Sequence, residues 1–265
     1  MRPAWFFRAL PIAAILVIGS CGSAVAQQIV KLRASFSPER LGTPTTISIA
    51  FRISSVPAGD SLPLTNVSVL LPDEMGLATS GLGLENCALS RLEAFGPSGC
   101  PANALMGRGT ASAEIPIGGE DIVESAQVEL FSSHVQNGRL ALMVYVDAKS
   151  PVFAQLVFPA TVVPASLPYG EGIDTEVPLV PTVPGGPNVA VTHFKMMIGT
   201  TTAGPDHFVY FRSAHRRRVP YHPRGLLLPP ACPRGGFPFQ ALFTFEDGST
   251  ATARTTVPCP RHTRH

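Results

Sequence analysis

Proline and glycine recur every few residues along this chain, 27 and 24 times in 265 residues, and they constrain its fold more than any other feature. Proline removes a backbone donor and glycine costs conformational entropy, so a long helix cannot carry either in its interior without loss of stability. Between these breaks, short segments alternate apolar and polar residues, which is the period of a β-strand with one buried face. The clearest segments are residues 29–36, 45–53, 64–71, 109–115, 125–131 and 140–146.

About a dozen such segments, with no sustained helical period, predict an all-β fold, namely an antiparallel β-sandwich of immunoglobulin-like architecture. One short helix is expected near residues 88–94. The pattern leaves open whether the chain forms one extended sandwich or two packed sandwiches. Prolines crowd residues 161–187, so we expect this stretch to connect an N-terminal β part, residues 27–160, to a C-terminal β part, residues 188–265.

Residues 1–26 have the features of a cleavable signal peptide. Arg2 and Arg8 precede an uncharged apolar run over residues 9–18, and Ala24-Val25-Ala26 has the small-x-small form of a cleavage site. The run is shorter than the roughly 20 residues that span a bilayer. Cleavage after Ala26 therefore predicts a secreted, extracytoplasmic protein.

A second interpretation of this segment stays open. Ile18-Gly19-Ser20-Cys21 resembles a bacterial lipobox, in which Cys21 would be the lipidated residue. In that case the protein would be a lipoprotein anchored at the membrane through Cys21. Membrane association is expected only by this route.

The charges of the chain are unevenly distributed. Removing residues 1–26 takes away two arginines and no acid, which leaves 18 basic and 18 acidic residues. Residues 27–211 hold 9 basic and 16 acidic residues, whereas residues 212–265 hold 9 arginines and only two acids. A basic C-terminal segment on an acidic body predicts contact with an acidic glycan, a cell-envelope component or the protein's own acidic region.

Four cysteines remain after residue 26, and an even count in an exported chain predicts disulfides. Of the three possible connectivities we favour Cys87–Cys100 and Cys232–Cys259, because each pair brackets a compact segment. The spacing does not match a zinc site.

The segment from Cys232 to Cys259 predicts a hairpin with a specific register. Apolar residues alternate from Phe237 to Phe245 and again from Ala251 to Val257. A three-residue loop with Gly248 in the left-handed conformation sets Phe243 against Ala251, which places every apolar side chain on one face. A two-residue turn would lose that match.

Several blocks resemble exported proteins found mainly in actinobacteria, which have no known activity. The blocks are Leu70-Leu71-Pro72, Gly76-Leu77, Cys87, Gly99-Cys100-Pro101-Ala102-Asn103, Met106-Gly107, Cys232-Pro233-x-Gly235-Gly236-Phe237, Asp247-Gly248 and Val257-Pro258-Cys259-Pro260. The resemblance covers most of the exported chain and implies a secreted, β-rich fold. It implies no activity and no catalytic residues.

The one concentrated candidate for ligand binding is a basic and aromatic cluster. Arginine grips carboxylates, sulfates and phosphates in a bidentate manner, so these residues could form an anion-binding surface. The alternative is a solvated basic loop that pairs with acids on the body. The cluster consists of Arg216, Arg217, Arg218, Tyr221, His222 and Arg224.

No catalytic motif was found, and no cofactor or metal is expected. The Gly107-Arg108-Gly109 sequence favours a tight strand crossing over a phosphate loop, because no helix pattern follows it. The acids Glu120, Asp121 and Glu124 lack the spacing of a calcium loop and favour a solvated loop. A metal site would need His193, His207, His215 and His222 to come together, which their spacing does not indicate.

The sequence therefore predicts a non-catalytic binding or structural module of the cell envelope, with no role in binding nucleic acid. The alternative is a secreted hydrolase of extracellular glycans with dispersed carboxylates. That activity requires two carboxylates roughly 5–10 Å apart in a cleft.

Overall fold

The computed structural model describes residues 27–75, 82, 85–117, 120–134, 139–150, 153–199, 210–214, 217–221 and 226–260. Within them the fold is nearly all antiparallel β, as the sequence predicts, with one short helix, α1 (Leu89–Phe95), near the expected position. The 3-10 turns η1 (Gly96–Gly99) and η2 (Ala102–Ala104) follow it. The strands are β1 (Gln27–Ser37), β2 (Pro44–Val56), β3 (Leu64–Pro72), β4 (Leu105–Ile117), β5 (Glu120–Ser132), β6 (Ala141–Ala148), β7 (Ala154–Pro164), β8 (Tyr169–Glu176), β9 (Ala190–Ile198), β10 (Tyr210–Ala214), β11 (Arg217–Tyr221), β12 (Leu226–Leu227), β13 (Phe237–Phe245) and β14 (Thr250–Val257).

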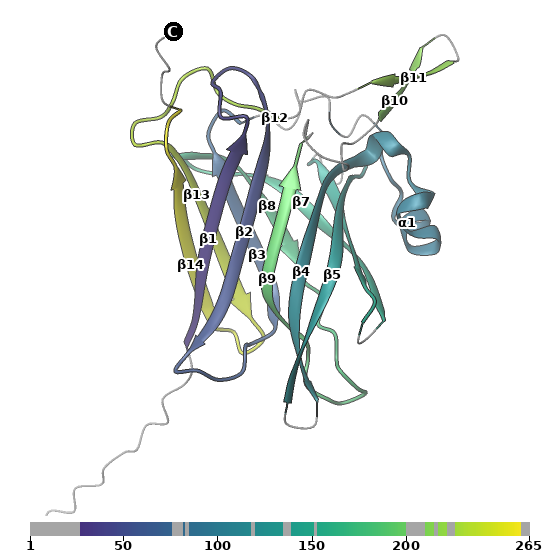
Figure 1. The fold of residues 1–265 in the computed structure, drawn as a ribbon, viewed down its shortest axis with the longest axis vertical. Coiled ribbons are helices and arrows are strands. Elements are labelled where there is room, and N and C mark those ends of the chain that lie inside the picture. Colours follow the sequence, from purple (N-terminus) through teal and green to yellow (C-terminus); the bar gives the residue numbers. More distant parts are fainter. Residues whose placement is uncertain are drawn as a thin grey trace, which may run out of the picture.

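Twelve of these strands form one sheet that curls into a nearly closed, barrel-like structure (Figure 1). Its order is β1-β2-β9-β4-β5-β6-β7-β8-β3-β13-β14, and β12 pairs with β2. The two strands at the ends of this path, β1 and β14, lie side by side. This arrangement differs from the expected immunoglobulin-like sandwich, because one continuous sheet replaces two separate ones. Alternation identifies the buried face of each strand, but it does not say which strands become neighbours.

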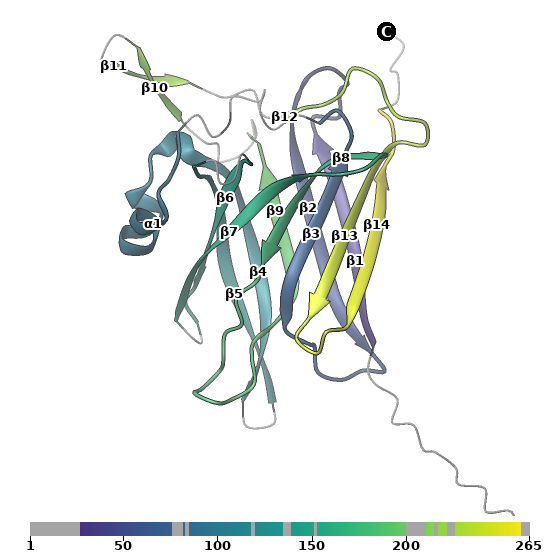
Figure 2. The same cartoon turned by 180° about the vertical axis from the view of Figure 1, so that it is seen from behind.

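The sheet order mixes strands from the two expected β parts, residues 27–160 and residues 188–265 (Figure 2). β9, from the C-terminal part, lies between β2 and β4, and β13 lies beside β3. Strand β8 falls within the proline-rich residues 161–187 and pairs with β7 and β3. Strands from both sides of this stretch therefore belong to one sheet.

The register of the last hairpin is the one predicted from the sequence. Phe243 lies opposite Ala251, and Phe237 lies opposite Val257. Gly248 has a φ of +80°, in the left-handed region where glycine is favoured over residues with a Cβ. The register prediction is confirmed, and the alternating apolar residues of β13 face the interior, whereas Leu242 is exposed on the outer face.

Phenylalanine side chains from β13 and β1 fill one part of the interior. Phe237, Phe239, Phe243 and Phe245 are each at most 1% exposed. Phe36 of β1 packs edge-on against Phe237, with ring centroids 5.3 Å apart. This part of the barrel is a packed core.

Both expected cysteine pairs occur in the structure. Cys87 pairs with Cys100, and their Cα atoms are 5.1 Å apart; Cys232 pairs with Cys259 at 5.8 Å. The first pair brackets α1 and η1. Ser132 Oγ donates a hydrogen bond to Asn86 Oδ1, and the N-terminus of α1 has no side-chain cap.

Residues 1–26 lie outside the described residues, and with them the expected cleavage after Ala26 and the lipidation of Cys21. No helix in the described part of the chain is long and apolar enough to span a membrane.

Candidate functional site

Small side chains face the interior where β4 to β7 pair. Register places four alanines opposite one another in a single row across these four strands. Cross-strand partners share one face of a sheet, so the row presents only methyl groups to the interior. Its members are Ala111 (β4), Ala126 (β5), Ala148 (β6) and Ala154 (β7), and all four line an internal cavity.

Strand β4 presents very small side chains to this interior. Its inward positions are occupied in turn by Gly107, Gly109, Ala111 and Ala113. Strand β9 lies so close that a Cβ on Gly109 would collide with the carbonyl oxygen of Lys195. The Gly-Arg-Gly sequence therefore lies in a strand and allows β4 and β9 to approach closely, as predicted, and it does not form a phosphate loop.

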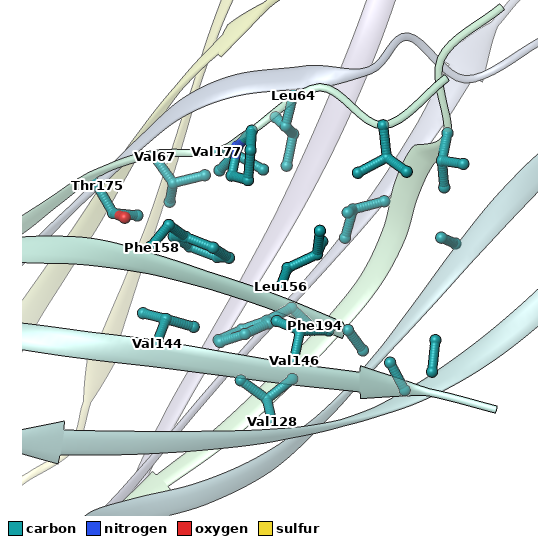
Figure 3. Close-up of a pocket in the computed structure, with 18 of the residues that line it drawn as sticks. Leu64, Val67, Val128, Val144, Val146, Leu156, Phe158, Thr175, Val177 and Phe194 are labelled. Atoms are coloured by element: carbon teal, nitrogen blue, oxygen red, sulfur yellow. The ribbon is translucent and has the colours of Figure 1, made fainter. Parts of the chain in front are cut away.

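The small residues leave a cavity of about 250 Å³ inside the sheet. Side chains from β3, β5, β6, β7, β8 and β9 converge on it in Figure 3, among them Val128, Val146, Leu156, Phe158 and Phe194. Nearly all the surrounding atoms are carbon. Apolar cavities of such size exclude water and take up apolar molecules, since an isolated water would lack hydrogen-bond partners there.

The row of alanines ends at two aromatic rings. Ala111 lies opposite Phe194 of β9, which in turn lies opposite Phe51 of β2. Phe51 also contacts Phe243 of the packed core, with ring centroids 5.0 Å apart. Phe51 lines the cavity and also contacts the packed core, so this ring lies where the hollow part of the interior meets the filled part.

The cavity extends toward the end of the barrel where β4 meets β5, β6 meets β7 and β8 meets β9. Its lining at this end includes Ile115, Ala148 and, from the β8–β9 loop, Pro178, Val180, Pro181 and Thr182. Large apolar side chains on the same three connections are exposed. They are Ile122, Val123, Phe153, Leu179 and Val183.

Among the described residues that line the cavity, Glu124 is the ionisable one, and Thr175 and Thr182 add the other side-chain polar groups, two hydroxyls. It is 5% exposed and lies opposite Ala113. Glu120 and Asp121 are exposed at the start of the same strand. The expectation of a solvated loop is therefore wrong for Glu124, because the inward alternation of β5 carries it into the barrel.

A second hollow, a groove of about 550 Å³, lies on the outer face of β4, β5, β6 and β9. Arg108 Nε donates to Glu129 Oε1 at 3.0 Å, and Lys149 Nζ lies 3.1 Å from Asp147 Oδ2. Burial and, secondarily, the charges of Asp147 and Glu129 raise the pKa of Tyr145 above its usual 10.0. The carboxylates of Glu129 and Asp147 are therefore each ion-paired on this outer face.

The described residues of the predicted basic cluster lie away from the mouth of the cavity. Arg217, Arg218 and Tyr221 belong to β11, which pairs with β10 in a separate two-stranded sheet near α1, at the other end of the molecule (Figure 1). Arg216, His222 and Arg224 lie outside the described residues. The anion-binding surface therefore stays a prediction.

Of the histidines considered for a metal site, the structure describes His193, while His207, His215 and His222 lie outside the described residues. Arg52 Nε donates a hydrogen bond of 2.8 Å to His193 Nε2. Burial and, secondarily, the Arg52 charge lower the pKa of His193 below 6.5. The described residues contain no group of three or more potential ligands placed to hold a metal.

Comparison of the chain with family models, curated proteins and solved structures finds no match.

The cavity was not predicted from the sequence. Its signal is the repetition of glycine and alanine at alternate positions 107, 109, 111 and 113, together with single alanines at 126, 148 and 154. Each alanine alone is ordinary in a strand. Only the register of four strands shows that they lie in one row.

Proposed function

We propose that this protein is an exported, non-catalytic binding protein that holds an apolar small molecule or acyl chain inside its barrel-like sheet. One observation carries the proposal. Four strands that could have filled the interior with large side chains instead place alanines opposite one another, and leave about 250 Å³ lined by carbon.

The physical argument rests on the cost of empty space. A void in a core sacrifices dispersion contacts and destabilises the fold by roughly 24 cal/mol per Å³ of cavity. An apolar ligand restores those contacts and gains about 0.8 kcal/mol for each CH₂ group that it removes from water. The exposed apolar side chains around the mouth, such as Val123 and Phe153, give the ligand a surface along which to enter.

Export is supported by the signal-like residues 1–26 and by the two cysteine pairs, which suit an oxidising compartment. A cell envelope supplies many amphiphiles whose chains need shielding from water. Binding is favoured over catalysis because the described lining is apolar apart from Glu124, Thr175 and Thr182.

The proposal is tested by titrating the exported protein with N-phenyl-1-naphthylamine (NPN), whose fluorescence rises in an apolar site. We expect saturable 1:1 binding with a Kd on the order of 1–10 μM. Ala126→Leu, which projects into the cavity, should weaken binding at least about tenfold.

Ser125→Leu is the matched control, because Ser125 is exposed on the outer face of the same strand. This variant adds a comparable apolar side chain and should bind NPN as the wild type does. The proposal fails if the wild type does not bind NPN or if both variants bind it equally well.

A further inference from the structure

One end of the otherwise apolar cavity carries an acidic side chain. Among the lining residues that the structure describes, Glu124 is the one with an ionisable side chain, and it is 5% exposed. It stands two residues before Ala126 on the inward face of β5, directly opposite Ala113. A ligand chain that occupies the alanine-lined space would therefore have the carboxyl group of Glu124 beside one of its ends.

The connections at the mouth of the cavity are also acidic. The strand ends and turns that frame it carry Glu114, Glu120, Asp121 and Glu176, and the β8–β9 loop over residues 177–189 contains no charged residue. Lys149, the cation on the β6–β7 connection, lies 3.1 Å from Asp147. An excess of one sign around a low-dielectric opening attracts the opposite charge and repels the same charge.

Building on the proposed function, we infer that the ligand is a cationic amphiphile, with an apolar chain and a protonated amine as its head group. The chain fills the space beside the alanine row, and the ammonium group donates to the carboxylate of Glu124. A fatty acid would place a second carboxylate next to Glu124 inside an apolar wall, where like charges repel most strongly. The cavity thus selects amines over fatty acids of the same chain length.

The inference is tested by displacing NPN from the exported protein with octylamine, 1-octanol and octanoate. Their eight-carbon chains are equal, so differences report the head group. We expect octylamine to bind at least about tenfold more tightly than octanoate, with octanol between them.

Glu124→Gln keeps the size of the side chain and removes its charge, and it should reduce the preference for octylamine to about threefold or less. Glu120→Gln is the control, since Glu120 is an exposed acid at the start of the same strand. It should leave the preference within about twofold of the wild-type value. Unaltered NPN binding by Glu124→Gln shows that the cavity persists in this variant.

Octanoate binding as tightly as octylamine to the wild type would overturn the inference. So would an unchanged preference in Glu124→Gln. Both outcomes leave the proposed function standing, because NPN still binds. Absence of NPN binding to the wild type would instead overturn the proposed function, and the inference with it.

Discussion

Phe51 of β2 stacks on Phe194 of β9, with ring centroids 5.1 Å apart and ring planes at 17°. Phe51 also meets Phe243 edge-on, and both Phe51 and Phe194 line the cavity. The pair therefore forms a partition inside the sheet. On one side the interior is filled by the phenylalanines of β13, and on the other side it is left open by the alanines of β4 to β7.

The two parts of the interior should respond oppositely to the same substitution. Ala241 is fully buried on β13 between Phe239 and Phe243, so Ala241→Leu should lower the free energy of unfolding by about 1–3 kcal/mol through overpacking. The leucine of Ala126→Leu enters the cavity, so this variant should leave the free energy of unfolding unchanged or raise it by up to about 1 kcal/mol. Urea unfolding of both variants measures the difference, and equal destabilisation would show that no usable space exists beside Ala126.

The close approach of β4 and β9 predicts a large effect from one methyl group. Gly109→Ala should destabilise the protein by about 1–3 kcal/mol, because the new Cβ collides with the carbonyl oxygen of Lys195. Gly59→Ala is the comparison, since its nearest atom would be 3.9 Å away and the residue is exposed. That variant should stay within about 0.5 kcal/mol of the wild type in the same unfolding experiment. A stable Gly109→Ala protein would contradict the strand spacing.

The hydrogen bond from Arg52 to His193 predicts how this histidine titrates. Its pKa is lowered in the folded protein, so the unfolded chain binds more protons between that value and 6.5, and stability falls as the pH drops through this window. Arg52→Gln removes the cationic neighbour and should raise the pKa of His193. An NMR titration of the imidazole measures this pKa.

Arg33→Gln is the control for the His193 titration, because it removes an exposed cation of β1 that lies opposite Ala50. This variant should leave the titration of His193 nearly unaltered. Equal shifts in the two variants would assign the lowered pKa to general charge and not to the contact with Arg52.

Glu171 of β8 predicts a second pH dependence with the opposite sign. Burial raises the pKa of its carboxyl above 4.5, so the folded state binds more protons than the unfolded state just above that pH, and stability is lost as the pH rises. Glu171→Gln should be more stable than the wild type at neutral pH, and the advantage should shrink below pH 4.5. Chemical unfolding at several pH values measures this difference; a pH-independent difference would contradict the burial of the carboxyl.

Local features of the fold could be predicted from the sequence because they depend on neighbouring residues. The strict alternation from Phe237 to Phe245, with Gly248 at the turn, determines both the faces and the register of the last hairpin. The spacing of the cysteines similarly indicates pairs that close short segments.

The closure of the sheet and the cavity could not be predicted, because both depend on strands distant in the sequence. Nothing in the pattern of residues 190–198 says that β9 lies between β2 and β4. Ala126 and Ala148 look alike in a packed core and in a hollow one, and only their placement in one row distinguishes the two. Glu124 interrupts the apolar alternation of β5, and this exception was the one local sign of a polar group inside.

The central claim is that the space beside the alanine row receives an apolar ligand. Crystals of the exported protein soaked with 1-bromooctane test it directly, because anomalous scattering locates bromine without reference to the protein. We predict a bromine peak inside the sheet, in contact with the side chains around Ala126 and Val146. An interior without bromine, with peaks confined to the outer surface, would contradict the account.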